Sequence, residues 1–276
     1  MFVAHTKRKG PIMSQTSTAA PPAGEKPPKT IRYEPTGRRI RIEFGGTVIA
    51  DSSRARLMVE SGHLPVYYLP LDDLRLDLMP QTDHTSFCPY KGTALYRSIV
   101  VGDRVAENAL WYYPDPLPGA PDLAGYAAFY WDKMDRWLEE DEVVFRHPRD
   151  PLKRVDALPS SRHVQVILGG EMVADTRRAV FLFETGLPTR YYIPAVDVRA
   201  GILRPSDTHT ECPYKGCASY HSLSVNGRDY DDLVWFYPEP IAACVGIKGL
   251  LSFYNEKVDA ILVDGETVPK VRTKWS

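Results

Sequence analysis

The chain contains an internal repeat with a separation of 124 residues. This separation is too long for a solenoid, and a module of about 110 residues has the size of an ordinary globular domain. At Pro80/Pro205 and His84/His209 the separation becomes 125, which indicates one residue gained on each side of this stretch. We therefore expect two tandem modules, each with its own core. Positions that the copies share include Gly45-Gly46, Asp51, Arg54, Glu60, Tyr67-Tyr68, Cys88, Pro89, Tyr90, Lys91, Gly92, Trp111, Tyr113, Phe129 and Tyr130.

Composition along the chain predicts where these modules begin and end. Residues 1–37 have no hydrophobic periodicity and are rich in Pro, Ser, Thr and Lys, so we predict a disordered N-terminal tail. Lys7-Arg8-Lys9 precedes no apolar segment, which argues against a secretory signal, and Met13 is an alternative start. We place the first repeat module at 38–147, a Pro-rich linker at 148–160 and the second module at 161–276.

The charge and cysteine content exclude several classes of protein. Since 34 basic residues oppose 35 acidic ones, the net charge is -1 and no global field attracts nucleic acid. The longest apolar run, Ile241 to Ile247, is too short to span a bilayer, so we expect no membrane partner. The four cysteines include no CxxC pair and are too few for a disulfide framework, which predicts a cytoplasmic protein.

Short β-prone runs bounded by Gly, Pro or Asp dominate each module. Arg39 to Phe44 alternates polar and apolar residues before Gly45-Gly46, which predicts an opening hairpin. Apolar residues recur at helical spacing over 123–134 and again over 247–258. There we predict a short helix ending near Phe129 or Phe253, followed by a strand. The expected fold class is mainly β, with two antiparallel modules and short helices.

The densest group of chemically active side chains spans His84 to Gly92 and recurs from His209 to Gly216. A cationic neighbour such as Lys91 favours the thiolate of Cys88, which could then act as a nucleophile or redox thiol. The alternative is a cysteine that packs as a small apolar residue at the end of a strand. The candidate catalytic residues are Cys88 with His84, and Cys212 with His209.

Two other kinds of site can be weighed from the residue types. Cys217 has no counterpart in the first copy, where Thr93 stands, so the ligand sets are unequal and we predict no metal site. Arg54 lies six residues before Glu60 in each copy, which could place an anion-binding guanidinium and a carboxylate in one pocket. The alternative is a structural ion pair.

The His84 to Gly92 block resembles the family of domain of unknown function 427, which is sometimes filed under a nucleotidyltransferase-like label. Ala50-Asp51-Ser52, Pro65 to Tyr68 and Trp111 to Pro114 match as well, and the resemblance extends from residue 38 to about 267. It implies a small antiparallel β module similar to the β-tent shape. Relatives with that shape hold zinc through two CxxC pairs, which this sequence lacks, so the resemblance implies the shape without the metal. We expect no cofactor.

Three functions remain, in this order of preference. The first is a module that binds a small molecule or anion, with one pocket per repeat. The second is a cysteine-dependent or redox enzyme, and the third is a scaffold in which the two copies pack as an intramolecular pseudo-dimer. The predicted pocket residues are Arg54, Glu60, Tyr68, His84, Lys91 and Trp111 in the first copy, and Arg178, Glu184, Tyr192, His209, Lys215 and Trp235 in the second.

Overall fold

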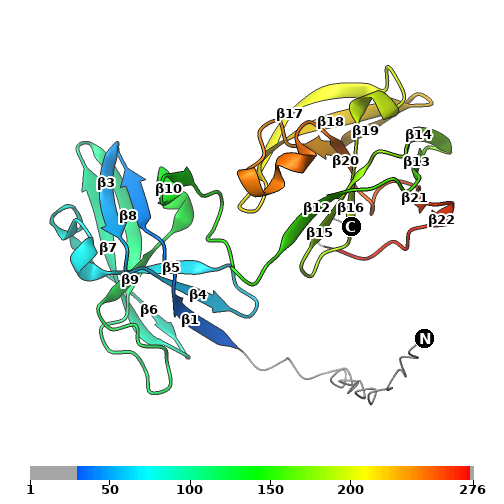
Figure 1. Cartoon of the computed structure of the whole chain (residues 1–276). Coiled ribbons are helices and arrows are strands. Elements are labelled where there is room, and N and C mark those ends of the chain that lie inside the picture. The colour runs from blue at the N-terminus through cyan, green and yellow to red at the C-terminus, as the bar shows by residue number, and fades with distance from the viewer. Residues whose placement is uncertain (1–29, 274–276) are drawn as a thin grey trace, which may run out of the picture. The chain divides into compact units, whose positions relative to one another are not determined.

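The computed structural model describes residues 30–273, so residues 1–29 of the predicted tail lie outside the described residues. The chain is mainly β, and its strands form two tandem antiparallel modules with the same topology, as the sequence predicts. In Figure 1 the strands of the first module run from blue to green and those of the second from green to red. Among residues 30–273, no sheet contains strands from both modules. None of the helices between residues 30 and 273 has the length and apolar character needed to cross a membrane.

The first module combines a seven-stranded sheet with a four-stranded one. The larger sheet has the order β1 (Ile31–Pro35), β4 (Arg56–Glu60), β5 (Val66–Pro70), β9 (Tyr126–Phe129), β8 (Arg104–Tyr112), β7 (Gly92–Val101) and β6 (Gln81–Cys88). The smaller has the order β11 (Glu142–Val143), β10 (Arg136–Glu139), β2 (Ile40–Phe44) and β3 (Thr47–Ser52). Three short 3-10 helices connect strands: η1 (Leu71–Asp73), η2 (Leu76–Leu78) and η3 (Trp131–Lys133).

The second module repeats this plan strand by strand. Its larger sheet has the order β12 (Val155–Pro159), β15 (Val180–Glu184), β16 (Arg190–Ile193), β20 (Leu251–Phe253), β19 (Arg228–Phe236), β18 (Gly216–Val225) and β17 (Leu203–Cys212). Its smaller sheet has the order β14 (Glu171–Thr176), β13 (Val164–Leu168), β21 (Ala260–Val263) and β22 (Glu266–Thr267). The 3-10 helices are η4 (Ala195–Asp197) and η5 (Ala242–Ile247).

Each seven-stranded sheet has apolar side chains on both faces. One face packs with alternate residues of the small sheet, such as Ile40 and Ile42, in an aliphatic core. The other face carries an aromatic cluster that includes Tyr68, Tyr96 and Tyr113. Adjacent residues of a strand point to opposite faces, so Tyr67 joins the aliphatic core and Tyr68 the aromatic cluster. The tyrosine pair therefore contributes to both.

Two of the predicted boundaries differ from the structure. β1 lies within the segment predicted as tail, and β12 lies within the predicted linker. β1 pairs with β4 from Ile31 opposite Glu60 to Pro35 opposite Arg56, and β12 pairs with β15 in the same way. Because these segments are rich in proline, the sequence pattern predicts a tail and a linker rather than strands. Both are edge strands, where a residue without an N–H is tolerated at the end of the ladder.

The short helix predicted to end near Phe129 is wrong. Residues Tyr126–Phe129 form β9, a 3-10 turn follows, and β10 begins at Arg136. Consecutive short elements each direct side chains into the core, and their combined spacing imitates a helix. In the second copy η5 does precede a strand, but it ends at Ile247 rather than near Phe253.

The strand register also corrects the residue equivalence between the copies. Thr85 pairs with Leu95, and His209 pairs with Ser219, which keeps the separation at 124. His209 is therefore the counterpart of Thr85, not of His84. A one-residue shift in a strand moves a side chain to the other face, so the two histidines occupy different environments.

The interior strand β8 allows a test of the aliphatic core. Leu110 is fully buried, and Val105 on the same strand is 56% exposed. Leu110→Ala should lower the free energy of unfolding by about 2–5 kcal/mol because it leaves a cavity. Val105→Ala should change it by less than about 0.5 kcal/mol. Chemical denaturation of both variants measures this, and equal losses would contradict the assignment of Leu110 to the core.

Candidate functional site

The repeated Cys-Pro-Tyr-Lys-Gly block forms the turn between β6 and β7. The Lys91 N–H donates to the Cys88 carbonyl at 3.2 Å, and the Leu117 N–H donates to the Lys91 carbonyl at 3.1 Å. Gly92 has a φ of 107°, and a Cβ there would lie 3.2 Å from the Asp115 carbonyl oxygen. Both constraints favour glycine, and Gly216 repeats them in the second copy.

The lysine of this turn makes a buried ion pair with β4. Lys91 Nζ lies 2.7 Å from Glu60 Oε2, and the two residues are only 9% and 7% exposed. Lys215 and Glu184 form the same pair at 2.5 Å. Although burial alone would lower it, the pKa of Lys215 is raised because the thiol of Cys212 and the carboxylate of Glu184 lie close to the ammonium group.

The sequence hypothesis of a shared pocket for Arg54 and Glu60 is wrong. Arg54 Nη2 contacts Asp73 Oδ1 at 2.5 Å, and its side chain is 58% exposed. Arg178 makes the equivalent contact with Asp197 at 2.7 Å. These are surface ion pairs outside the aromatic cluster.

The tyrosine of each predicted pocket and Trp235 are core residues, whereas Trp111 is partly buried. Tyr68 and Tyr192 are almost fully buried, and Trp235 Nε1 donates to the Tyr192 hydroxyl at 3.0 Å. Trp111 packs against the cluster that contains Tyr68. Burial raises the pKa of both tyrosines, so they remain protonated.

The histidines do not partner the cysteines. The ring of His84 packs against Tyr96 with centroids 4.4 Å apart, and His209 Nδ1 lies 3.2 Å from Ser219 Oγ. Within the part of the chain that the structure describes, neither ring makes a hydrogen bond with Cys88 or Cys212. The same described part contains no group of three or more His, Cys, Asp or Glu placed to hold a metal ion.

A cavity of about 410 Å³ opens beside the aromatic cluster in the first copy. Tyr33 and Arg56 line it together with Ile31 and the loop Gly119 to Asp122. The Tyr33 hydroxyl and the Arg56 Nε are buried without a hydrogen-bond partner among the described residues. Arg56 lies over the Tyr33 ring, with Cζ 4.6 Å from its centroid.

The register explains why these two side chains meet. Tyr33 lies opposite Met58, so Tyr33, Arg56, Met58 and Glu60 share the aromatic face of the sheet. Tyr68 lies directly opposite Arg56 on β5, and its ring meets Tyr33 edge-on at 5.7 Å. The sequence analysis did not name Arg56, because it took Arg54 as the arginine that shares a pocket with Glu60. Period-2 spacing fits Arg54 and Arg56 equally, and Arg56 is the one that lies within β4 together with Glu60.

In the second copy, other parts of the chain occupy the position of this cavity. Ala157 and Val180 stand where the first copy has Tyr33 and Arg56. The helix η5 packs on β12 there, and a Cβ on Gly246 would lie 3.7 Å from the Ala157 Cβ. Small residues on both sides allow this close approach, whereas Tyr33 and the Pro121 loop hold the first copy open.

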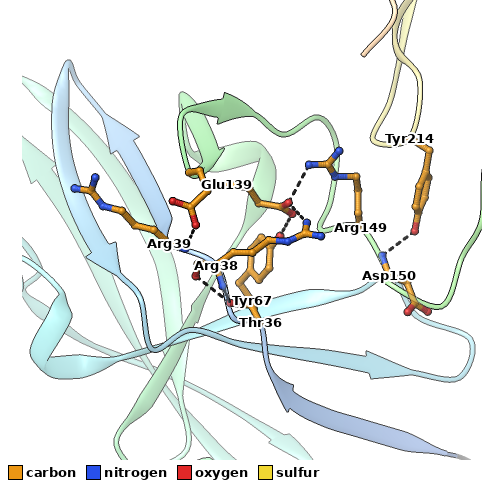
Figure 2. Close-up of polar contacts among 9 residues, drawn as sticks. Thr36, Arg38, Arg39, Tyr67, Glu139, Arg149, Asp150 and Tyr214 are labelled. Carbon is orange, nitrogen blue, oxygen red and sulfur yellow. Dashed lines mark hydrogen bonds and ion pairs between the residues drawn. The ribbon is translucent and has the colours of Figure 1, made fainter. Parts of the chain in front are cut away.

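A second polar group is also specific to the first copy. Figure 2 shows the buried Glu139 carboxylate between Arg38 and Arg149, with the Tyr67 hydroxyl donating to it. The Arg149 contact is 2.9 Å. Burial alone would raise the pKa of Glu139, but these donors lower it. In the second copy Val263 replaces this glutamate.

The segment that follows this group is held by a further hydrogen bond. The Asp150 N–H donates to the Tyr214 hydroxyl at 2.9 Å, and the Leu152 N–H donates to the Asp150 carboxylate at 3.0 Å. Figure 2 shows the first of these contacts. The connection between the copies is therefore tied at both Arg149 and Asp150.

The buried ion pair predicts an asymmetric response to mutation. Lys91→Met should destabilise the protein by about 3–5 kcal/mol because it leaves the Glu60 charge buried without its cation. The double variant Lys91→Met with Glu60→Leu should recover a large part of this loss. Denaturant unfolding of the two variants provides the measurement. A double variant as unstable as the single one would show that the pair does not act as a unit.

Glu256 predicts that the stability of the protein depends on pH. Two 2.7 Å hydrogen bonds from Arg190 lower the pKa of Glu256 to about 2 from 4.5, although burial opposes the shift. A carboxylate with a depressed pKa stabilises the folded state above pH 4.5, and this stabilisation is lost as the pH falls towards 2. Between these values the stability of Glu256→Gln should fall less steeply than that of the natural protein. Parallel curves from urea unfolding at pH 5, 4 and 3 would refute the assignment.

Comparison with known proteins agrees with the duplicated architecture. No curated protein matches the chain. The sequence profile described as domain of unknown function DUF427 matches twice, at residues 32–140 and 156–264. These ranges contain β1 through β10 and β12 through β21, apart from a residue at each N-terminal edge. With both modules matched over most of their length, the chain is a tandem two-copy member of the DUF427 family.

Proposed function

We propose that the first module binds a small organic anion in the cavity lined by Tyr33 and Arg56. The observation that carries this proposal is a pair of buried donors at the cavity wall, the Tyr33 hydroxyl and the Arg56 Nε, that have no hydrogen-bond partner among residues 30–273. A buried donor left unpaired costs about 1–3 kcal/mol, so native proteins rarely keep two together without a purpose. A single carboxylate can accept from both groups.

The protonation states of these side chains support an anionic ligand. Arg56 carries a permanent positive charge. Burial is the main cause that raises the pKa of Tyr33 far above its ordinary value, so its hydroxyl remains a donor at every physiological pH. Both groups can therefore donate to a carboxylate, and neither competes for a ligand's protons.

The rest of the cavity favours a ligand with one negative charge and an apolar body. Ile31, Ala120 and Pro121 offer apolar surface, and a volume near 410 Å³ suits a small organic molecule. Asp122 also lines the cavity and would repel a second negative charge. A monocarboxylate fits these features better than a nucleotide or a sugar phosphate.

This proposal keeps the binding function predicted from the sequence but changes its residues and number. Tyr68 lies opposite Arg56 and its ring packs edge-on against Tyr33. The Lys91–Glu60 pair fixes the strand that carries Arg56. The second copy has Val180 in place of the arginine, so we propose one such site in the chain rather than one per repeat. The contacts of the histidines give the enzyme alternative no comparable support.

Arg54 and Arg56 provide a matched pair of variants. Each substitution removes one positive charge within three residues, but only Arg56 lines the cavity. We expect benzoate, phenylacetate or hexanoate at millimolar concentration to raise the melting temperature of the natural protein. Arg56→Ala should abolish the shift, and Arg54→Ala should retain it.

Two further measurements make the test decisive. Asp122→Asn should strengthen binding of the same carboxylate several-fold in calorimetry, because it removes the repelling charge. Inorganic phosphate should produce a smaller shift than the carboxylates. The proposal is overturned if none of the three carboxylates stabilises the protein, or if Arg54→Ala and Arg56→Ala weaken the shift equally.

A further inference from the structure

The second module places two cysteines at one turn. Cys212 ends β17 and begins the Cys-Pro-Tyr-Lys-Gly turn, and Cys244 lies in η5. The Cys244 thiol donates to the carbonyl oxygen of Tyr214 at 3.2 Å, and Tyr214 is only two residues after Cys212. Cys212 packs against the aromatic cluster that contains Cys244. Both sulfur atoms therefore approach the same short stretch of backbone.

The two thiols differ in exposure. Cys212 is partly exposed, whereas Cys244 is fully buried. Burial raises the pKa of Cys244 to about 11, and the proximity of Cys212 contributes in the same direction. Cys212 is thus the sulfur that an external oxidant reaches first.

We propose that Cys212 and Cys244 form a reversible disulfide when the protein meets a hydroperoxide. The Cys212 thiolate attacks the terminal peroxide oxygen, the O–O bond breaks, and a sulfenic acid and an alcohol, or water from hydrogen peroxide, are formed. Cys244 then loses its proton and its sulfur attacks the Cys212 sulfur. The S–S bond forms, and the departing hydroxide takes up that proton as water. Two thiols are oxidised and one peroxide is reduced.

The first module supplies an internal control. Cys88 occupies the place of Cys212 beside Lys91, but Ala120 stands where the second module has Cys244. Cys88 therefore lacks this partner, and its sulfenic acid has no equivalent thiol to react with. Cys217 is the remaining competitor, because it is exposed and follows the same turn. This proposal uses no residue of the anion cavity and stands or falls separately from it.

The test is a peptide map of the full-length protein. One equivalent of hydrogen peroxide is added, the protein is unfolded in N-ethylmaleimide so that buried thiols react, and the peptides are sequenced by mass spectrometry. We expect a Cys212–Cys244 peptide whose mass is two hydrogens below the sum of its parts, and we expect dithiothreitol to remove it. Dimedone should label Cys88 at least tenfold more than Cys212 during oxidation.

Variants separate this outcome from its alternatives. In Cys244→Ala, dimedone labelling of Cys212 should rise to the level of Cys88, whereas Cys217→Ser should leave the crosslink unchanged. Measurements on the natural protein alone can overturn the proposal, so the test does not depend on whether a variant folds. A Cys212–Cys217 crosslink would overturn the proposal. Full recovery of Cys244 as its maleimide adduct, while Cys212 is oxidised to the sulfinic acid, would also overturn it.

Discussion

The buried Lys91–Glu60 pair joins two distant parts of the seven-stranded sheet. Glu60 lies on β4, the second strand in the sheet order, while Lys91 lies in the turn between β7 and β6 at its other end. A contact of 2.7 Å between these positions requires the sheet to curl around its aromatic face. The curl encloses Tyr68 and its neighbours, and it brings the cysteine of the turn against the same cluster. Removing two charges from water is costly, so the pair holds this closure only because each ion compensates the other.

The copies share this frame and differ in the side chains attached to it. Tyr33 and Arg56 keep a cavity open in the first copy, where Ala157 and Val180 let η5 close it in the second. Buried carboxylates have diverged as well. The first copy pairs Glu139 with Arg38 and Arg149, while the second pairs Glu256 with Arg190. Duplication has therefore preserved the backbone and the ion pair of the turn while the two aromatic faces acquired separate chemistry.

The sequence reveals the parts of this architecture that depend on local pattern. The repeat, the mainly β class and the opening hairpin follow from residue identity and period-2 alternation. The Lys91–Glu60 pair does not, because it joins positions 31 residues apart that only the curl of the sheet brings together. The repeat favours Arg54, because Arg178 stands at the same distance from Glu184, whereas Val180 replaces Arg56 in the second copy. The structure excludes Arg54 because it precedes β4 and pairs with Asp73. The histidine equivalence failed for the same reason, since matching identities ignored a one-residue change of face.

The constant separation of 124 has a consequence for how the polypeptide reaches its native state. Because the two modules have the same register, each strand has a second possible pairing partner of the right length in the other module. Repeat proteins are prone to misassembly through such wrong pairings. If β1 paired with β15 instead of β4, Tyr33 would occupy the place of Ala157, where a Cβ on Gly246 already approaches within 3.7 Å. If β12 paired with β4, Ala157 would leave Arg56 without the ring that covers it. The same side chains that distinguish the two aromatic faces thus oppose exchange of edge strands during folding.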